Sequence, residues 1–592
     1  YQKDNRNNIN TTLRLNYDLS SLLTKGLSVH GSIAYDSYYY SRKKYSKTFP
    51  YYLARRDAED PDYIYLIPQS EESIWSVSTG WDKNRKVYME FGIDYNRTFG
   101  LHKTTALILY NQSKYYSPSL QYYVPNAYQG LVGRLTYEYA SRYLAEFNMG
   151  YNGTENFAKG KRFGFFPAVS LGWVISEEKF FPKNNIVKYL KVRGSYGEVG
   201  NDQIGGDRFL YLPSSYGAAS DSGVNKYNFG LASNPYTSLM IVENKIGNPD
   251  LTWEKAKKMN VGVDINLFNN CLTASFDIFK EKRNNILANR STSPMIIGAN
   301  LPAYNFGEME NRGWEMDLNF RHHIQDFHYW ARFNYSFARN EIIYMDEVQK
   351  RYDYQMTTGR RKNQFFGLIF DGYYNSWEEI NALDRPKSSW SGNQLQPGDV
   401  KYIDVNQDGV IDDYDMVPIG YTPVPEIIYG FSFGAQYKGF DFSILFQGAD
   451  NVSIKYFGRS MWPFAKGEES AKSLIKERWT QERYEAGEKI TFPRLSLNPN
   501  GETDHNYRPS TLWIRDASYL RLKNLEVGYT FTGGFVKRLN LNSVRLYFNG
   551  SNLFTWTDVV DLDPEAPSRS GNVEINTYPL QKVYNIGLNI NF

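Results

Sequence analysis

The chain has 592 residues, with 67 Lys and Arg against 64 Asp and Glu, which gives a formal net charge of +3. This near-neutral balance offers no electrostatic case for nucleic-acid binding, and the lack of an apolar run of about 18 residues excludes membrane-spanning helices. A transmembrane β-barrel remains open, because apolar and polar residues alternate along each of its strands.

Aromatic residues make up 17% of the chain, including 50 Tyr. This content favours a β-rich protein with aromatic girdles at two membrane interfaces. The single cysteine, Cys271, excludes an intrachain disulfide. The chain starts at Tyr1 and shows no signal peptide, so we expect a processed chain or a fragment whose targeting segment lies upstream.

Regular alternation of apolar and polar residues predicts β-strands along the whole chain. Each such strand has one face suited to lipid and another that carries carboxylates, amides or glycine and suits a wet lumen. The last of them ends on an aromatic, Phe592, as is typical of outer-membrane barrels. The clearest segments are Val87–Tyr95, Tyr143–Tyr151, Val261–Leu267, Trp314–Phe320 and Tyr584–Phe592.

The links between these strands alternate in length. Short links are expected at Leu19–Gly26, Phe99–His102, Ala140–Arg142, Asn269–Cys271, His322–His328 and Lys438–Gly439. Long links are expected at Ser41–Arg85, Gly200–Ala256, Lys282–Arg312, Asn340–Glu426 and Ala449–Ala517. Short periplasmic turns and long extracellular loops describe an outer-membrane barrel, so the sequence predicts an all-β, antiparallel transmembrane β-barrel of about sixteen strands.

The long loops contain few other signals. Ser470–Arg483 is the best candidate for a helix, and residues 360–362 (Arg-Arg-Lys) are interpreted as exposed loop charge. His102, His322 and His323 are expected at turns, in water. No motif of a hydrolase, a nucleotide-binding loop or a zinc site occurs, so we expect no catalysis.

One acidic segment in the long extracellular loop 340–426 has the spacing of a calcium site. Residues 404–415 read DVNQDGVIDDYD, similar to an EF-hand loop with Gly409 at the sharp turn. Calcium in a structural role and a solvated turn without metal both fit this pattern. The candidate ligands are Asp404, Asn406, Asp408, Val410 through its carbonyl, Asp412 and Asp415.

Several segments resemble one protein family. Tyr189–Asn201, Gly247–Lys255 and Phe306–Trp314 resemble later barrel strands of TonB-dependent outer-membrane receptors. Four further segments are similar to the SusC/RagA branch of that family: Gly398–Asp412, Tyr429–Gly448, Asp516–Phe531 and Leu546–Thr557.

The resemblance implies a 22-stranded barrel that encloses an N-terminal plug. Residues 1–592 then form the C-terminal portion of one such barrel, with the plug absent from this chain. It also implies an active importer of a glycan or a peptide in the outer membrane of a Gram-negative bacterium. TonB would act through the plug and a SusD-like surface lipoprotein would be the partner. Whether the complex is a dimer of importer–lipoprotein pairs stays open.

Two other functions remain as alternatives at this point. A passive porin of about sixteen strands would be complete as given and would conduct without TonB. A secreted, calcium-binding, glycan-active β protein would be water-soluble, with two sheets packed on a dry core. The alternation of short and long loops speaks against the second alternative.

Overall fold

The computed structural model describes residues 1–592 except 57–58, 61, 121–122, 204–207, 214–216, 219–225, 232–235, 240, 243–245, 293–300, 391–394, 459–460, 465–472, 497–503, 566–571 and 574–578. The chain divides into two compact units. The first comprises Tyr1–Ala140, Leu144–Val169 and Gly200–Trp253. The second comprises Ser141–Tyr143, Ser170–Val199 and Glu254–Phe592.

In the part of the chain that the structure describes, seventeen long strands are assigned to one antiparallel sheet, where the sequence predicts about sixteen. In the first unit, neighbours in the chain pair with one another: Gly31 lies opposite Leu15 and Phe91, and Tyr110 lies opposite Phe91 and Leu131. The early strands are β1 (Gln2–Asp18), β2 (Leu27–Ser46), β5 (Ser76–Phe99), β6 (His102–Tyr116), β7 (Asn126–Tyr139), β8 (Tyr143–Thr154) and β9 (Phe163–Val174).

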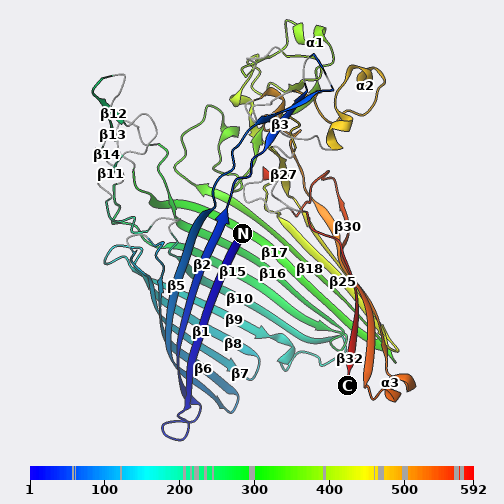
Figure 1. Ribbon diagram of the computed structural model, residues 1–592. Helices are drawn as coiled ribbons and strands as arrows, with labels where there is room; N and C mark the ends of the chain where they lie inside the picture. Colours follow the sequence, from blue (N-terminus) through cyan, green and yellow to red (C-terminus); the bar gives the residue numbers. More distant parts are fainter. Residues whose placement is uncertain are drawn as a thin grey trace. The chain divides into compact units, whose positions relative to one another are not determined.

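The second unit has the same up-and-down order, and Figure 1 shows β15 to β18 running side by side. The same pairing leads from β18 through β25, β26, β29 and β30 to β32. The strands are β10 (Val187–Asn201), β15 (Glu254–Leu267), β16 (Leu272–Ala288), β17 (Tyr304–Ile324), β18 (Phe327–Tyr344), β25 (Ile427–Tyr437), β26 (Phe440–Asp450), β29 (Tyr519–Phe531), β30 (Ser543–Thr557) and β32 (Val583–Asn591).

Short elements lie in the links. The small strands are β3 (Tyr52–Arg56), β4 (Ile64–Pro68), β11 (Gly217–Ala218), β12 (Lys226–Phe229), β13 (Tyr236–Leu239), β14 (Ile241–Val242), β19 (Phe366–Gly367), β20 (Phe370–Tyr373), β21 (Lys387–Ser388), β22 (Val400–Tyr402), β23 (Val410–Ile411), β24 (Val417–Pro418), β27 (Ser453–Tyr456), β28 (Ile514–Asp516) and β31 (Asn572–Val573). The α-helices are α1 (Trp377–Asn381), α2 (Gln481–Glu485) and α3 (Gly534–Arg538). None of the helices in the described residues is long and apolar enough to cross a membrane.

Most predicted short links are confirmed. The turn between β25 and β26 consists of Lys438 and Gly439, whose φ angles are +44° and +89°. Two positive φ angles match the right-handed twist of the flanking strands, which is why such two-residue turns favour glycine. Turns also stand at Leu19–Gly26, Ala140–Arg142 and residues 268–271, as the sequence predicts.

Some local predictions are wrong. His322 and His323 lie inside β17, and the turn consists of Gln325 and Asp326. The predicted links Ser41–Arg85, Lys282–Arg312 and Asn340–Glu426 contain strand ends, because β2 continues to Ser46, β16 to Ala288 and β18 to Tyr344. Alternation fades where both faces of a strand are polar, yet the backbone pairing continues there.

The helix expected at Ser470–Arg483 is also absent as a single element. A 3-10 helix covers Ser473–Glu477, and α2 starts only at Gln481, after Thr480 accepts a hydrogen bond from the backbone N–H of Arg483 at 3.3 Å. Residues 470–472 lie outside the described residues.

The sheet is amphipathic in the opposite sense to a water-soluble protein. Apolar positions of the alternation are exposed even on strands that pair on both sides: Phe91 of β5, Ile108 of β6 and Val261 of β15 are 51%, 55% and 56% exposed. Ile586 at an apolar position of β32 is 80% exposed. Large exposed apolar side chains in a continuous row indicate a surface that meets another apolar phase. This distribution is what a strand with one face in lipid requires.

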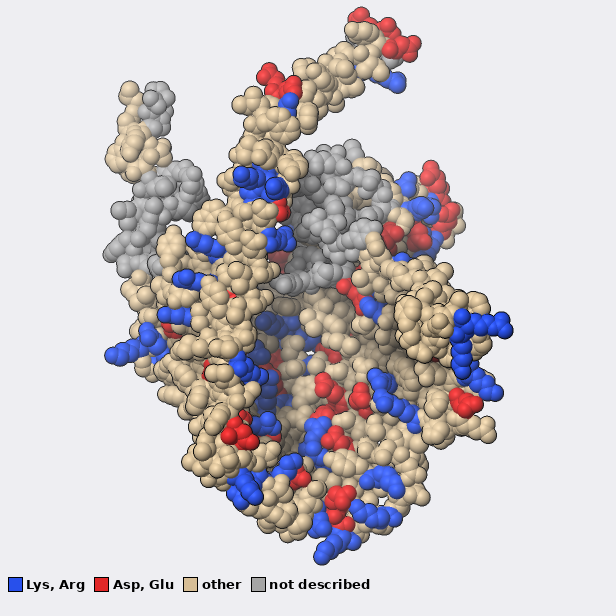
Figure 2. Space-filling model, turned by 60° about the horizontal axis from the view of Figure 1, so that its bottom comes forward, with Lys and Arg blue, Asp and Glu red and all other residues tan. Residues whose placement is uncertain are grey.

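The opposite face carries charged side chains that form ion pairs across neighbouring strands. Arg193 of β10 contacts Asp264 of β15 at 3.1 Å and Asp277 of β16 at 2.7 Å. Arg545 of β30 contacts Glu526 of β29 at 2.7 Å in the same manner. Figure 2 shows charged side chains of both signs scattered among uncharged residues. Paired charges of this kind suit a water-lined face.

We expect a charge on the apolar face of β32 to oppose membrane insertion, and a charge on its polar face to be tolerated. In the full-length receptor, Ile586→Arg should destabilise the folded protein by about 2–4 kcal/mol, against about 1 kcal/mol or less for Asn585→Arg. Denaturant unfolding in lipid vesicles measures both. Equal effects of the two neighbouring substitutions would contradict a lipid-facing apolar row.

Candidate functional site

The links that follow β18, β26 and β30 pack on one another and form a compact assembly, which we call the loop assembly (residues 345–425, 451–518 and 558–582). Its centre is apolar, and Trp513, Tyr456 and Phe492 are each at most 1% exposed. The buried cluster, which we call the loop core, comprises Leu368, Tyr373, Val400, Tyr402, Ile411, Val452, Ile454, Tyr456, Met461, Trp462, Leu474, Trp479, Phe492, Tyr507, Leu512, Trp513, Ala517 and Val559.

A buried polar network crosses the loop core. Asp399, whose side chain is 4% exposed, accepts hydrogen bonds from Arg494 Nε at 2.5 Å and from Asn506 Nδ2 at 2.8 Å. Asn506 Oδ1 in turn accepts from the backbone N–H of Val400 at 2.9 Å. A buried charge must be paired and hydrogen-bonded, so this network fixes the link after β18 to the link after β26.

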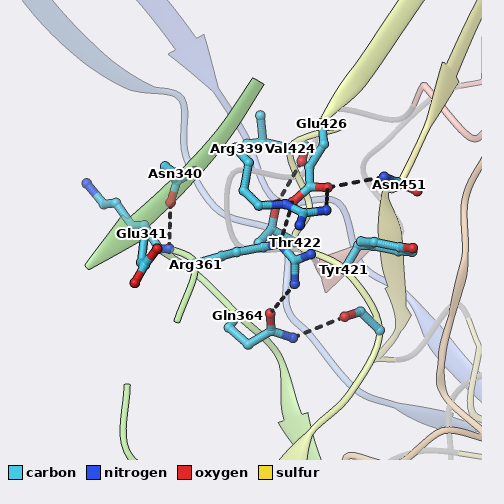
Figure 3. Close-up of polar contacts among 12 residues, drawn as sticks. Arg339, Asn340, Glu341, Arg361, Gln364, Tyr421, Thr422, Val424, Glu426 and Asn451 are labelled. Carbon is cyan, nitrogen blue, oxygen red and sulfur yellow. Dashed lines mark hydrogen bonds and ion pairs between the residues drawn. The ribbon is translucent and has the colours of Figure 1, made fainter. Parts of the chain in front are cut away.

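A second buried carboxylate ties the loop assembly to the sheet (Figure 3). Glu426, 5% exposed, directly precedes β25. Arg339 of β18 donates to both of its oxygens, at 2.9 and 2.8 Å, and Asn451 Nδ2 donates at 3.1 Å. Arg361, from the link, donates to the same carboxylate. We call Arg339, Arg361, Glu426 and Asn451 the Glu426 cluster.

The cluster closes the base of the longest link. The backbone carbonyl of Glu426 accepts from the N–H of Ala338 at 2.8 Å, so the link ends where β25 joins β18. Gln364 accepts from Arg361 at 3.3 Å and donates to the carbonyl of Ile419 at 2.9 Å. The two ends of the link are thereby fixed to each other and to the sheet.

The electrostatics of Glu426 follow from these contacts. Burial acts to raise the pKa of its carboxyl, but hydrogen bonds and charges from Arg339 and Arg361 outweigh burial and hold the pKa below the ordinary value of 4.5. A depressed pKa means that the ionised form stabilises the fold above the unfolded-state pKa. This contribution is lost as the pH falls below 4.5 through the folded-state pKa.

The acidic segment 404–415 forms a tight turn in which carboxylate and amide oxygens mainly accept hydrogen bonds from its own backbone. Asp404 Oδ2 accepts from Gly409 N at 2.7 Å, and Asp408 Oδ1 accepts from Val410 N at 3.0 Å. Asp412 Oδ1 accepts from Tyr414 N at 2.7 Å. Gly409 has a φ of +83°, as the sharp turn requires.

Asp415 lies at the centre of this turn and is fully buried. Its oxygens accept from the backbone N–H groups of Val405 and Asp412, both at 2.8 Å, and Asn406 Oδ1 accepts from Asp408 N at 3.0 Å. Burial raises the pKa of Asp415, and the charge of Asp404 adds to that rise. In the part of the chain that the structure describes, no three acidic, His or Cys side chains come together as metal ligands. Calcium binding by this segment therefore stays a prediction.

No pattern in the sequence predicts the Glu426 cluster. Arg361 is expected from the sequence to be exposed loop charge, whereas only 23% of its side chain is exposed and its guanidinium binds Glu426. The partners are 65 residues apart, so no local spacing reveals them. The only signal was indirect: Asn340 and Glu426 were placed at the two ends of one long loop.

The chain is similar to known outer-membrane receptors. The family model "TonB dependent receptor-like, beta-barrel" matches residues 1–553. TonB-dependent receptor P3 of Formosa agariphila is 28% identical over 479 residues, 78% of this chain and 45% of the relative. TonB-dependent receptor SusC of Bacteroides thetaiotaomicron is 28% identical over 477 residues, 80% of this chain and 44% of the relative. The chain thus spans about half the length of these relatives.

The fold matches a solved structure. The structure of the RagAB peptide transporter aligns with a TM-score of 0.73 and 20% identity, over 100% of this chain and 62% of that one. At this identity the match shows the fold alone. The matched curated relatives are receptors and not enzymes.

Glu426→Gln should loosen the base of the long link, because two arginines then face a neutral amide. Breaking a buried charge pair costs on the order of 3 kcal/mol, so amide hydrogens of residues 345–390 and 395–425 should exchange about 100-fold faster. Glu341→Gln is the control. Glu341 is 44% exposed, and its contact with Arg312 is long, at 4.0 Å. An exposed ion pair of this kind contributes about 1 kcal/mol or less. Exchange rates that are equal in the two variants would contradict the assigned role of Glu426.

Proposed function

We propose that this chain, which belongs to the TonB-dependent receptor β-barrel family, forms the wall and outer surface of an active importer of oligomeric nutrients. The location we propose is the outer membrane of a Gram-negative bacterium. The observation that carries the proposal is that the same sheet has an exposed apolar face and a polar face with ion pairs. A lipid-facing wall around a hydrophilic path needs both faces.

Each part of the chain has a task in this proposal. The polar face, with fixed pairs such as Arg193–Asp277, lines the path and keeps its charges compensated. The loop assembly presents the binding surface, and its buried core allows long links to hold one shape without ligand. A rigid binding surface loses less conformational entropy when the nutrient binds.

The energy source and the partner are further parts of the proposal. We infer that the complete receptor has a 22-stranded barrel around a plug, through which TonB acts. A SusD-like surface lipoprotein is proposed to deliver the nutrient to the loop assembly. The support is the similarity to SusC and the fold shared with RagA of the RagAB transporter. The nutrient is an oligosaccharide or a peptide.

Deletion of the TonB gene should abolish uptake by cells that depend on this receptor. Fluorescent oligosaccharides and peptides, supplied separately, measure uptake and identify the class of nutrient. The purified receptor should not conduct ions in planar bilayers, because opening needs energy from TonB. Steady conductance and unchanged uptake without TonB would instead favour the passive porin.

We also propose calcium as a structural cofactor of segment 404–415. Asp404, Asn406, Asp408, Asp412 and Asp415 would supply side-chain oxygens and Val410 its carbonyl. Two observations support a cation here. Asp404 Oδ1 is inaccessible to solvent and has no hydrogen-bond partner in the described part of the chain, and the nearby carboxyl of Asp415 is buried. Calcium would compensate both charges and stiffen the turn.

Calcium should slow hydrogen exchange across residues 404–415 in the wild-type receptor, and a chelator should reverse the effect. Asp404→Asn should weaken the response about tenfold or more, since it removes one charged ligand. Asp413→Asn is the matched control, because Asp413 lies outside the proposed ligands. If hydrogen exchange is the same with calcium and with chelator, the calcium site is refuted, and residues 404–415 are a solvated turn without metal.

A further inference from the structure

The apolar face of the first five long strands carries positive charges but no negative ones. This face is defined by the register Leu13–Ile33–Met89–Gln112–Gln129 across β1, β2, β5, β6 and β7. Every second residue of these strands shares it, and no Asp or Glu occurs among those positions in the five strands, which the structure describes in full. Five cations do occur at the end where the long links emerge, and all are exposed: Lys3, Lys43, Lys83, Arg85 and Lys114.

These five cations, which we call the basic rim, have no carboxylate partner among the described residues. Lys3 lies directly opposite Lys43 in the register, an arrangement of like charges that destabilises a sheet unless an anion intervenes. Arg85 and Lys114 both lie over the ring of Tyr116, at 4.5 and 5.9 Å from its centre. By contrast, Lys280 and Lys282 of β16 in the second unit are each ion-paired with a glutamate, at 2.9 Å.

Two hollows lie on this part of the sheet. The first, about 250 Å³, is lined by Leu13, Leu15, Ile33, Phe91 and Tyr110, and Gly31, which has no side chain to fill it, lies among the lining residues. The second, about 520 Å³, is lined by the rim residue Lys114 with Tyr116, Val87 and Gln112. Met89 lines both hollows, so the apolar groove adjoins a second hollow whose lining includes the cations Lys114 and Arg162 and the carboxylate of Glu155.

Other charges at the second hollow do not neutralise the rim. Glu155 lies at its border, but this carboxylate is paired with Arg208 at 2.7 Å. The polar face of the same strands keeps its own pairs, such as Arg42 with Asp4 at 3.2 Å. The rim therefore presents uncompensated positive charge beside exposed apolar side chains, which matches a molecule with an anionic head and an apolar tail.

We propose that the basic rim and the Gly31 groove bind a lipid of the surrounding membrane whose headgroup carries an anionic phosphate. The phosphate contacts Lys83, Arg85 and Lys114, and an acyl chain lies along the groove beside Gly31. Lys3 and Lys43 add long-range attraction. This inference rests on the proposed outer-membrane location but not on the identity of the imported nutrient.

The test measures lipids retained by the purified full-length receptor, by native mass spectrometry after exchange into micelles doped with phosphatidylglycerol or phosphatidylcholine. The wild-type protein should retain phosphatidylglycerol preferentially. Lys83→Gln with Lys114→Gln should weaken this retention about tenfold, and added salt should weaken it in the wild type. The control is Lys44→Gln with Lys86→Gln, which removes the same charge from the polar face of β2 and β5 and should leave retention unchanged.

A second variant tests the groove. Gly31→Val places a branched side chain in it, whose Cβ would meet only the carbonyl oxygen of Glu90, at 3.8 Å. It should reduce retention of both lipids, while the preference for phosphatidylglycerol, which depends on the rim cations, should remain as evidence that the strands are still folded. Equal phosphatidylglycerol retention by wild type and the Lys83/Lys114 variant would overturn the proposal. Displacement by millimolar inorganic phosphate would also overturn it, in favour of a free-phosphate site. TonB-dependent uptake, measured separately, shows whether the proposed function fails on its own.

Discussion

Backbone hydrogen bonding between neighbouring strands is the constraint on which the rest of the molecule depends. A strand in the apolar part of a membrane has no water to satisfy its N–H and C=O groups, so each must pair with the next strand. Long, nearly uninterrupted ladders such as that between β2 and β5, from Leu27 opposite Tyr95 to Ser46 opposite Ser76, meet this demand. Side chains are then free to sort by face, with apolar side chains on one face and polar side chains on the other.

This inverted sorting moves the apolar core of the second unit away from the strands. In a soluble β protein the two sheet faces bury the core between them. Here much of the apolar surface of the strands is exposed, and deeply buried aromatics such as Trp513 and Phe492 lie in the loop assembly. The loop assembly therefore has a buried apolar core of its own, as a small globular domain does. The Glu426 cluster attaches it to β18 and β25.

Local sequence patterns predicted strand faces and turns, because these depend on interactions between residues close in the chain. Alternation identified the apolar faces of β5, β15 and β32, and glycine with polar residues identified turns such as Lys438–Gly439. Alternation failed at His322, because near the polar turns both faces of a strand tolerate polar residues. Pairing between distant residues, such as Arg361 with Glu426, lies beyond any local pattern. Neither pattern nor spacing identifies the family; the resemblance of several segments to TonB-dependent receptors does, and the family model confirms the family.

The central claim is that one face of the sheet meets lipid and the other meets water. Single cysteines, placed in a Cys271→Ser background at Ile586 and Leu588 or at Asn585 and Asn589 of β32, measure this directly in vesicles. We expect labels at Ile586 and Leu588 to be quenched by lipid-dissolved quenchers. Labels at Asn585 and Asn589 should instead react with a water-soluble maleimide. Equal accessibility of all four positions, or the reversed pattern, would contradict the account.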